Sequence, residues 1–307
     1  MERRYPLIDV PLGLAEQLLS SISDVAKPRS LQLLSGGHVN TNYAVQMSDG
    51  EKLVLRIYAS GEAALAKETE ILRKLAGSVA VPGVKLATAK HDGFKHPYAV
   101  LDWIEGVPLN RVLLEEPESA PEIGDALAAI LINIRNQSVR VESSVSVIEA
   151  LRNYLADQNV AQHLGEERSS RLWNLVRENS AMIDELCTQT GLVHGDFQGD
   201  NILLEKTFGK WRVNGILDWE WAHNGCFLRD VGSLLRYPAE SSEAFMTALE
   251  AGFSRRGVPL PPQWIMASRI WDLVPNCEKL TSPTNRGDVT LRALGVIDRC
   301  LNDYAAA

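Results

Sequence analysis

The sequence predicts an α+β protein in which strands occupy the first hundred residues and helices dominate the remainder. Short apolar or alternating segments, separated by glycine turns, recur up to residue 101, which is typical of strands. Beyond residue 106 the apolar residues instead recur at helical spacing. The length of 307 residues suits one large or two modest domains, and the apolar content is sufficient for a real core.

The strand-rich part is expected to form a small antiparallel sheet with one main helix. Turns such as Asp49-Gly50 separate the first strands and favour a meander. Apolar residues at helical spacing predict the helix over residues 62–75, and Gly77 ends it. The predicted strands cover residues 30–34, 43–46, 53–57, 84–88 and 98–101.

The remaining sequence is expected to be mostly helical. The acidic, proline-containing segment 115–121 is the candidate exposed loop, and no repeat or low-complexity tract interrupts the pattern. The predicted helices cover residues 120–136, 145–163, 167–187, 240–255, 262–280 and 288–301.

Composition excludes several classes of protein. A net charge of −8 and the absence of a long Lys/Arg run argue against nucleic-acid binding. The longest apolar stretch, residues 126–132, is too short for a membrane span, and residues 1–6 lack a signal peptide's apolar segment, so we expect a cytoplasmic protein. The four cysteines show no metal-binding spacing and are expected to be reduced, small buried hydrophobes: Cys187, Cys226, Cys277 and Cys300.

The most informative segment begins at His194-Gly195-Asp196 and ends at Asn201. It has the H-x-D-x-x-x-x-N spacing with which kinases place an acceptor-binding carboxylate near a metal-binding amide. Asp218 follows a second apolar run and is the candidate for another Mg²⁺ ligand. Phosphoryl transfer depends mainly on positioning and charge neutralisation, so Asp196, Asn201 and Asp218 form nearly the minimum set of residues.

An ordinary turn is the alternative interpretation, because Gly-Asp and Gly-Asp-Asn are common turn sequences. The context favours function. Apolar residues 191–193 precede the segment and residues 202–204 follow it, while residues 213–217 lead into Asp218. These patterns predict a loop held between short buried strands.

On these motifs the chain resembles the aminoglycoside phosphotransferase and choline kinase-like family, over nearly its whole length. The resemblance implies the bilobal protein-kinase fold: a nucleotide-binding lobe at residues 1–102, a hinge at 103–106, and a catalytic and substrate lobe at 107–307. It further implies Mg²⁺, with ATP or GTP bound between the lobes, and transfer of a phosphate to a hydroxyl of a small molecule.

The resemblance also assigns residues that contact the nucleotide. Residues 34–43 correspond to the family's nucleotide-covering loop, in which Gly36, Gly37, His38 and Asn40 are candidates; taken alone, Gly36-Gly37 is equally a hairpin turn. Arg56 ends the third strand, where kinases usually carry a phosphate-binding lysine.

Glu68 is the expected partner of Arg56 because it lies nearer the apolar face of its helix, with Glu70 as the competing choice and a solvated surface position open to both. The hinge residues Asp102, Trp103 and Ile104 would contact the purine through backbone groups, although Trp103 is equally suited to a core position. Backbone recognition does not distinguish ATP from GTP.

Further along, Asp230 is expected to hydrogen-bond and brace the catalytic loop. It follows Gly225, but Cys226-Phe227 replaces the family's usual Asp-Pro at this point. This departure concerns the local loop geometry and leaves the three catalytic and metal-binding candidates unchanged.

Two rival functions are a protein kinase and an inactive nucleotide-binding sensor. Gln198 replaces the lysine that serine/threonine kinases carry, and an A-P-E-terminated activation segment is missing. Retention of Asp196, Asn201 and Asp218 argues against a sensor.

The acceptor stays open among an aminoglycoside-like antibiotic, an amino alcohol and a sugar. From Trp219 onward the sequence contains ten acidic and nine basic residues. It therefore lacks the strong excess of carboxylates that would indicate a binding site for a polycation. Four tryptophans in this region are suited either to a substrate platform or to core packing: Trp219, Trp221, Trp264 and Trp271. The sequence does not determine the oligomeric state.

Overall fold

The structure is a computed structural model, and it describes residues 5–23, 25–34, 39–139, 141–143, 145–282 and 287–306. Its contacts divide the chain into two compact units. The sheet unit contains the described residues up to Gly106 together with Asn214–Glu220. The helical unit contains Val107–Val213 and the chain from Trp221 onward. The α+β class is therefore confirmed, and a seven-residue segment from the later chain joins the sheet unit.

The sheet unit is built on a five-stranded antiparallel sheet in the order β1-β2-β3-β5-β4. The predicted strands are all present, with boundaries shifted by at most two residues, and the helix at residues 62–75 is confirmed. The sequence analysis missed one short helix, α1. The elements in chain order are α1 (Leu12–Leu18), β1 (Pro28–Leu33), β2 (Thr41–Met47), β3 (Lys52–Ile57), α2 (Glu62–Leu75), β4 (Val84–Thr88) and β5 (Tyr98–Asp102).

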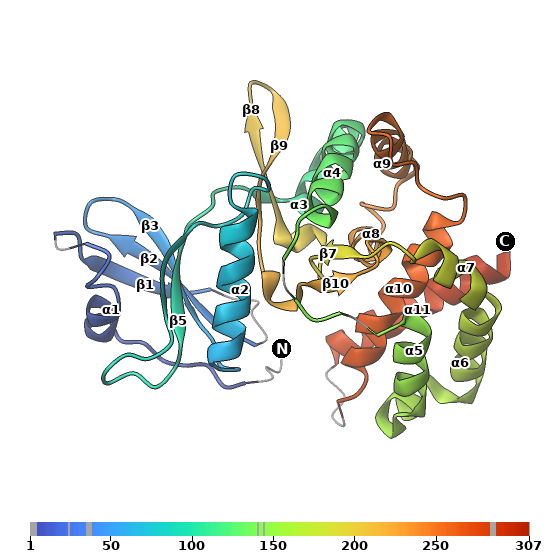
Figure 1. Cartoon of the computed structure of the whole chain (residues 1–307), viewed down its shortest axis with the longest axis horizontal. Helices are drawn as coiled ribbons and strands as arrows, with labels where there is room; N and C mark the ends of the chain where they lie inside the picture. Colours follow the sequence, from blue (N-terminus) through green and yellow to red (C-terminus); the bar gives the residue numbers. More distant parts are fainter. Residues whose placement is uncertain are drawn as a thin grey trace. The chain divides into compact units, whose positions relative to one another are not determined.

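The alternation of side chains along β3 explains how one strand serves both a core and a charged site. Leu53, Leu55 and Ile57 pack with residues of α1 in one apolar cluster. Arg56 lies between two of them in sequence, so its side chain leaves the opposite face of the strand. On that side it meets α2, which packs against β4 and β5 (Figure 1).

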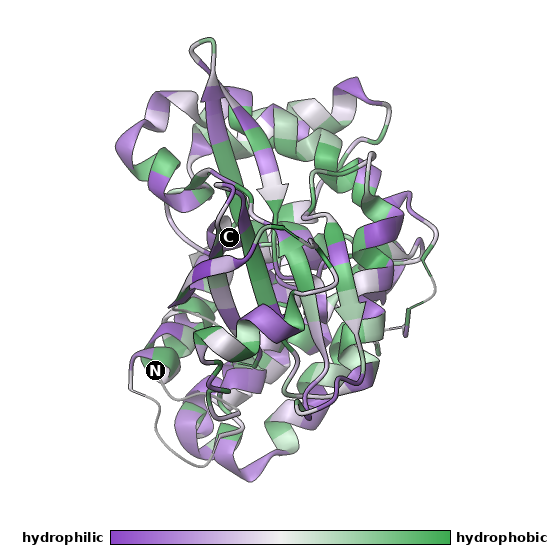
Figure 2. Cartoon of the chain, turned by 90° about the vertical axis from the view of Figure 1, so that its left-hand side faces the viewer, coloured by the Kyte–Doolittle hydropathy of each residue, from purple (hydrophilic) through white to green (hydrophobic). Residues whose placement is uncertain are grey.

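The rest of the chain is mainly helical. Figure 2 shows hydrophilic and hydrophobic residues alternating along the helices, as expected for amphipathic packing. The elements from residue 107 are β6 (Val107–Pro108), α3 (Leu109–Glu115), α4 (Ala120–Arg135), α5 (Val147–Ala156), α6 (Gln158–Glu178), α7 (Ser180–Leu186), β7 (Gly191–Val193), β8 (Ile202–Thr207), β9 (Lys210–Ile216), β10 (His223–Gly225), α8 (Leu228–Leu234), α9 (Glu243–Arg255), α10 (Trp264–Lys279) and α11 (Asp288–Ala306), with 3₁₀ turns at Pro117–Ser119, Gly199–Asn201 and Trp219–Trp221.

The predicted break between residues 163 and 167 is confirmed, whereas two other helix boundaries in this region, at Asp157 and at Asn179, were not predicted. Asp157 is extended, and its carboxylate accepts hydrogen bonds from the N–H groups of Asn159 and Val160, so it ends α5 and starts α6. The expected break between residues 163 and 167 lies at Gly165, whose φ of +73° interrupts the helical backbone within α6. The apolar periodicity continues through Asp157, so it does not reveal that the Asp157 side chain caps a new helix.

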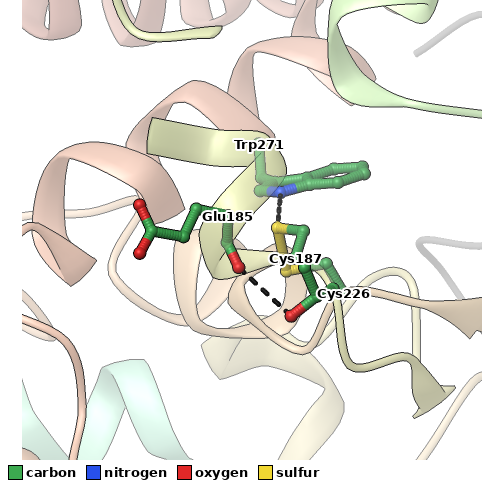
Figure 3. The surroundings of a disulfide bond; sticks show 5 residues. Glu185, Cys187, Cys226 and Trp271 are labelled. Carbon is green, nitrogen blue, oxygen red and sulfur yellow. Dashed lines mark hydrogen bonds between the residues drawn. A yellow bond between two sulfur atoms is a disulfide. The ribbon is translucent and has the colours of Figure 1, made fainter. Parts of the chain in front are cut away.

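Two of the cysteines are not free thiols, contrary to the expectation. Cys187 and Cys226 form a disulfide with their Cα atoms 5.2 Å apart, and the Trp271 indole N–H donates to Cys187 Sγ over 3.1 Å (Figure 3). The prediction was wrong because the fold brings together residues 39 positions apart, which no local spacing rule detects. Cys277 and Cys300 are free and buried, as expected.

Among the described residues, every helix is too short or too polar to cross a membrane. Three of the four late tryptophans lie in the core, since Trp219, Trp264 and Trp271 are each at most 4% exposed. Trp221 is 39% exposed and is the remaining candidate for a platform.

Candidate active site

The loop after β7 carries Asp196. Strand β7 pairs with β10, and the 3₁₀ turn Gly199–Asn201 leads from the loop into β8, so both ends of the loop are fixed by short strands. Gly195 adopts φ +84°, and a Cβ at this position would overlap the carbonyl oxygen of Trp221. Only glycine fits here without strain.

Asp230 braces the start of this loop, as expected. Its carboxylate accepts hydrogen bonds from the backbone N–H groups of His194 over 2.7 Å and of Gly195 over 2.9 Å. Burial raises the pKa of Asp230, while these donors oppose the rise. The side chain is 1% exposed, so it acts on the loop from within the core and does not face a ligand.

The Asp196 carboxylate is held from two directions. Gln198 Nε2 donates to Oδ2 over 3.0 Å, and Asn201 Nδ2 lies 3.3 Å from the same oxygen. The Asn201 amide also donates to the Asp196 carbonyl over 2.9 Å. The Asp196 side chain is nevertheless 25% exposed. The result is an oriented and accessible carboxylate, as a group that receives an acceptor proton must be.

The sequence did not predict the buried ion pair between Arg236 and Asp272, which lies next to Asp196. The guanidinium of Arg236 is 1% exposed and lies 2.7 Å from Asp272 Oδ1, while its Nη1 donates to Gln198 Oε1 over 3.0 Å. Arg236 also lies 3.7 Å from Asp196 Oδ1. Burial alone would lower the pKa of Arg236, but Asp272 and Asp196 raise it, so the group stays charged.

The sequence offered one signal for this pair. Asp272 lies between Trp271 and Leu273 on a strongly apolar helix, where a charge needs a buried partner. In the sequence, Gln198 indicates only a departure from protein kinases. In the structure it connects the Arg236–Asp272 pair to the catalytic loop.

A second buried carboxylate lies beside the 3₁₀ turn. Glu240 is fully buried, and neither of its carboxylate oxygens has a hydrogen-bond partner. A Cβ at Gly199 would overlap Glu240 Oε1, which explains the glycine there. Burial, together with the charge of Asp200, raises the pKa of Glu240 to about 7.

In the sheet unit, Arg56 is the centre of a charged cluster. Its Nε lies 2.9 Å from Glu68 Oε2 and its Nη2 lies 2.6 Å from Asp218 Oδ1. Glu68 is 2% exposed, whereas the competing Glu70 is exposed. The geometry therefore selects Glu68 as the partner of Arg56. Burial raises the pKa of Glu68, and Arg56 opposes that rise.

Asp218 has a left-handed backbone conformation. Its φ is +66°, a value that is uncommon for residues other than glycine but that aspartate adopts more readily than most, and such residues are often found at functional sites. The side chain is 33% exposed while one oxygen contacts Arg56. Glu220 follows two residues later, with Oε2 3.6 Å from Arg56 Nη2.

Part of the predicted nucleotide loop is described. Gly36, Gly37 and His38 lie outside the described residues. Asn40 is 3% exposed, and its Nδ2 donates to Glu220 Oε2 over 2.6 Å. Asn40 is thus connected through Glu220 to the Arg56 cluster.

The candidate hinge residues follow the last strand of the sheet. The Asp102 N–H donates to the carbonyl of Gly83, and its carboxylate lies 3.4 Å from Lys85. The Lys52 ammonium lies 5.6 Å from the centre of the Trp103 ring, which places this tryptophan among polar neighbours. Ile104 packs so closely against Gly215 that a Cβ there would clash with it.

Two oxygen-bearing side chains, one in each unit, are the candidates for holding Mg²⁺. Asn201 uses Nδ2 within the loop, so Oδ1 is the atom that the amide presents for a metal, and Asp218 adds a half-exposed carboxylate. No group of three or more metal-ligating side chains occurs among the described residues. Such a sparse set suits Mg²⁺, which takes one or two protein carboxylates together with water and phosphate oxygens.

Comparison with known proteins gives a family match over most of the chain. Residues 30–264 match the family described as "Phosphotransferase enzyme family". Viomycin phosphotransferase from Streptomyces vinaceus is 30% identical over 129 residues, which cover 40% of this chain and 44% of that protein. A probable acyl-CoA dehydrogenase, IBR3, from Arabidopsis thaliana is 24% identical over 253 residues, covering 73% of this chain and 30% of that protein. The chain thus spans less than half the length of these curated relatives.

The fold has close neighbours among solved structures. The GDP complex of wild-type aminoglycoside 2'-phosphotransferase-IIIa superposes with a TM-score of 0.76 at 19% identity, covering 94% of this chain and 97% of that chain. Similarity at this level of identity establishes the fold, which confirms the kinase-like arrangement expected from the motifs.

Proposed function

Because the chain belongs to the phosphotransferase enzyme family, we propose that it transfers the γ-phosphate of ATP or GTP to a hydroxyl of a small acceptor. The observation that carries this proposal is the arrangement of Asp196. Its carboxylate is accessible, is oriented by Gln198 and Asn201, and lies on a loop that Asp230 fixes from the core. A carboxylate held in this way is the group that phosphoryl transfer requires on the acceptor side.

We assign the phosphate-binding role to Arg56. Glu68 and Asp218 keep this buried guanidinium charged, and its fork suits two phosphate oxygens. The loop residues Gly36, Gly37, His38 and Asn40 would cover the phosphates. Backbone groups of Asp102, Trp103 and Ile104 would contact the purine. In this assignment residues 1–102 bind the nucleotide, residues 103–106 are the hinge, and residues 107–307 provide catalysis and acceptor binding.

The proposed ligands of Mg²⁺ are Asn201 and Asp218. When bound, Mg²⁺ would neutralise negative charge on the phosphates. Asp196 would accept a hydrogen bond from the acceptor hydroxyl and receive its proton as the oxygen attacks. Gln198 keeps the carboxylate in position, and Arg236 in turn holds Gln198.

Nucleotide binding can be tested by calorimetry with ATP and GTP, each with and without Mg²⁺. We expect metal-dependent binding of at least one nucleotide, which Asp218→Ala and Asn201→Ala both weaken without unfolding the protein. Circular dichroism serves as the folding control. If neither nucleotide binds more tightly with Mg²⁺, the assignment of both ligands is wrong.

The acceptor class can be found by a nucleotide-consumption screen against aminoglycosides, viomycin, amino alcohols, hydroxy acids and simple sugars. Asp196→Asn is the blank, because it keeps the side-chain shape and removes the proton acceptor. A small-molecule hit that depends on Asp196 supports the proposal. Phosphorylation of peptides alone would point to a protein kinase, and nucleotide binding without any turnover would point to a sensor.

We further propose that the protein acts in the cytoplasm, where nucleoside triphosphates are produced. There the Cys187–Cys226 disulfide would exchange with the cellular thiol pool. Cell fractionation, with the thiols alkylated at lysis, would test the location and the oxidation state together.

A further inference from the structure

Two partly buried cations in the helical unit, Arg229 and Lys279, form no side-chain hydrogen bond or ion pair with the residues that the structure describes. The Nε of Arg229 is inaccessible to solvent and has no hydrogen-bond partner. Lys279 is influenced by the surrounding charges, yet it makes neither a hydrogen bond nor an ion pair with any residue that the structure describes. Partial removal from water without a partner destabilises a cation, so a ligand that supplies the opposite charge would bind favourably to these two side chains.

Both cations lie on helices that also carry residues supporting the Asp196 loop. Arg229 is on α8 and directly precedes Asp230, which binds the backbone of His194 and Gly195. Lys279 is at the end of α10, seven residues after Asp272, and therefore lies on the same helix face. Asp272 binds Arg236, which lies 3.7 Å from Asp196.

The charges that act on Arg229 and on Lys279 include the charge of Asp196. Burial lowers the pKa of Arg229, and Asp230, Glu278 and Asp196 are among the groups that oppose this shift. Burial lowers the pKa of Lys279 to about 8, with Arg236 adding repulsion and Asp196 adding attraction. Both cations therefore interact with the charge of the catalytic carboxylate.

Most carboxylates around the two cations already have a partner or an assigned role. Asp272 binds Arg236, Asp230 accepts two backbone N–H groups, and Asp196 is assigned to the acceptor hydroxyl. Glu278 influences both Arg229 and Lys279 but lies within ion-pair distance of neither among the described contacts. Tyr154 is the other titratable neighbour of Arg229, and burial raises its pKa to about 12, so it stays neutral. Among the described residues, Glu278 is therefore the one neighbouring carboxylate that has neither a partner nor an assigned role, and it stands against two cations.

We propose that Arg229 and Lys279 bind an anionic group of the acceptor, a carboxylate or a phosphate, and so place its hydroxyl at Asp196. This inference rests on the proposed function and specifies its substrate class. A polycationic aminoglycoside would be repelled by the same two side chains, whereas a hydroxylated acid would complete their ion pairs. The similarity to antibiotic-modifying enzymes therefore does not extend to the acceptor.

The test compares acceptors that differ by one carboxylate. Glycerate is paired with glycerol and gluconate with glucose, while glycerol phosphate represents the phosphate class and kanamycin the polycations. We expect each anion to have a KM about tenfold to a hundredfold below that of its neutral partner, the range for one charge-assisted hydrogen-bond pair. Lys279→Met should remove this ratio and leave nucleotide affinity unchanged. Lys210→Met, an exposed lysine on β9, is the matched control.

Binding is measured separately from turnover, so the two proposals can fail independently. Calorimetry of the Mg²⁺–nucleotide-loaded protein with glycerate and glycerol needs no reaction, and Arg229→Gln provides a second variant. Equal binding of the matched pair, or anion binding that survives both substitutions, overturns the inference. So does turnover of kanamycin in preference to every anion. Loss of Asp196 dependence would instead overturn the proposed function.

Discussion

Glu240 provides a sharp test of the environment around the catalytic loop. Its carboxylate is fully buried beside Gly199 and Asp200, and both oxygens lack hydrogen-bond partners. Ionisation must therefore occur without solvent or a compensating cation. We predict that Glu240→Gln, which cannot ionise, stabilises the protein above neutral pH and loses that advantage in acid.

The magnitude follows from the shift in pKa. The carboxyl of Glu240 has a pKa of about 7 in the folded protein and an ordinary value of 4.5. Well below pH 4.5 both states are protonated, so ionisation has no effect on stability. Between the two values the unfolded chain releases its proton first, and stability falls as the pH rises. Above pH 7 the loss levels off at about 3 kcal/mol, since one pKa unit corresponds to about 1.4 kcal/mol.

The assay is urea unfolding at about pH 5 and about pH 8 for the wild type, Glu240→Gln and Glu250→Gln. Glu250 is exposed on α9 and controls for removal of a surface charge. The pH dependence of the wild type and of Glu250→Gln should exceed that of Glu240→Gln by about 2.5 kcal/mol, because the unfolded chain is already partly ionised at about pH 5. If all three proteins show the same dependence, Glu240 ionises normally and the description of its environment is wrong.

Three further predictions concern the supports of the catalytic loop. Asp230→Ala should lower the free energy of unfolding by about 3 kcal/mol in chemical denaturation, because two buried N–H groups lose their acceptor; a change within error would contradict the brace. Arg236→Lys should reduce kcat about tenfold at unchanged nucleotide affinity, because lysine cannot hold Asp272 and Gln198 together; a change in nucleotide affinity alone would exclude this role. Denatured, unreduced protein should titrate two thiols, and Cys226→Ala should lower stability by about 4 kcal/mol through loop entropy; four titratable thiols would show that the disulfide is not formed.

The sequence predicted correctly those structural features that depend on residues close together in the chain. The alternation along residues 53–57 predicts a strand, and the same alternation places Arg56 on the face opposite Leu55. Helical periodicity selected Glu68 over Glu70, and the structure pairs Glu68 with Arg56. The spacing from His194 to Asn201 identified a loop between two strands, because the apolar residues on either side of it are local as well.

Contacts between distant segments could not be predicted in this way. The Arg236–Asp272 pair and the Cys187–Cys226 disulfide each connect residues more than thirty positions apart, so only the tertiary fold brings them together. Helix α1 was missed because its seven residues are too few to establish a period. The break at Asp157 depends on a side-chain cap, which competes with an uninterrupted helical pattern.

The most direct test of the central claim is mass spectrometry of an acceptor after incubation with nucleotide, Mg²⁺ and either the wild type or Asp196→Asn. We predict that a small hydroxylated acceptor gains one phosphoryl group with the wild type. Asp196→Asn should bind Mg²⁺–nucleotide equally well and form product at least about a hundredfold more slowly, the scale of general-base catalysis. An Asp196→Asn variant that phosphorylates the acceptor at the wild-type rate would contradict the account.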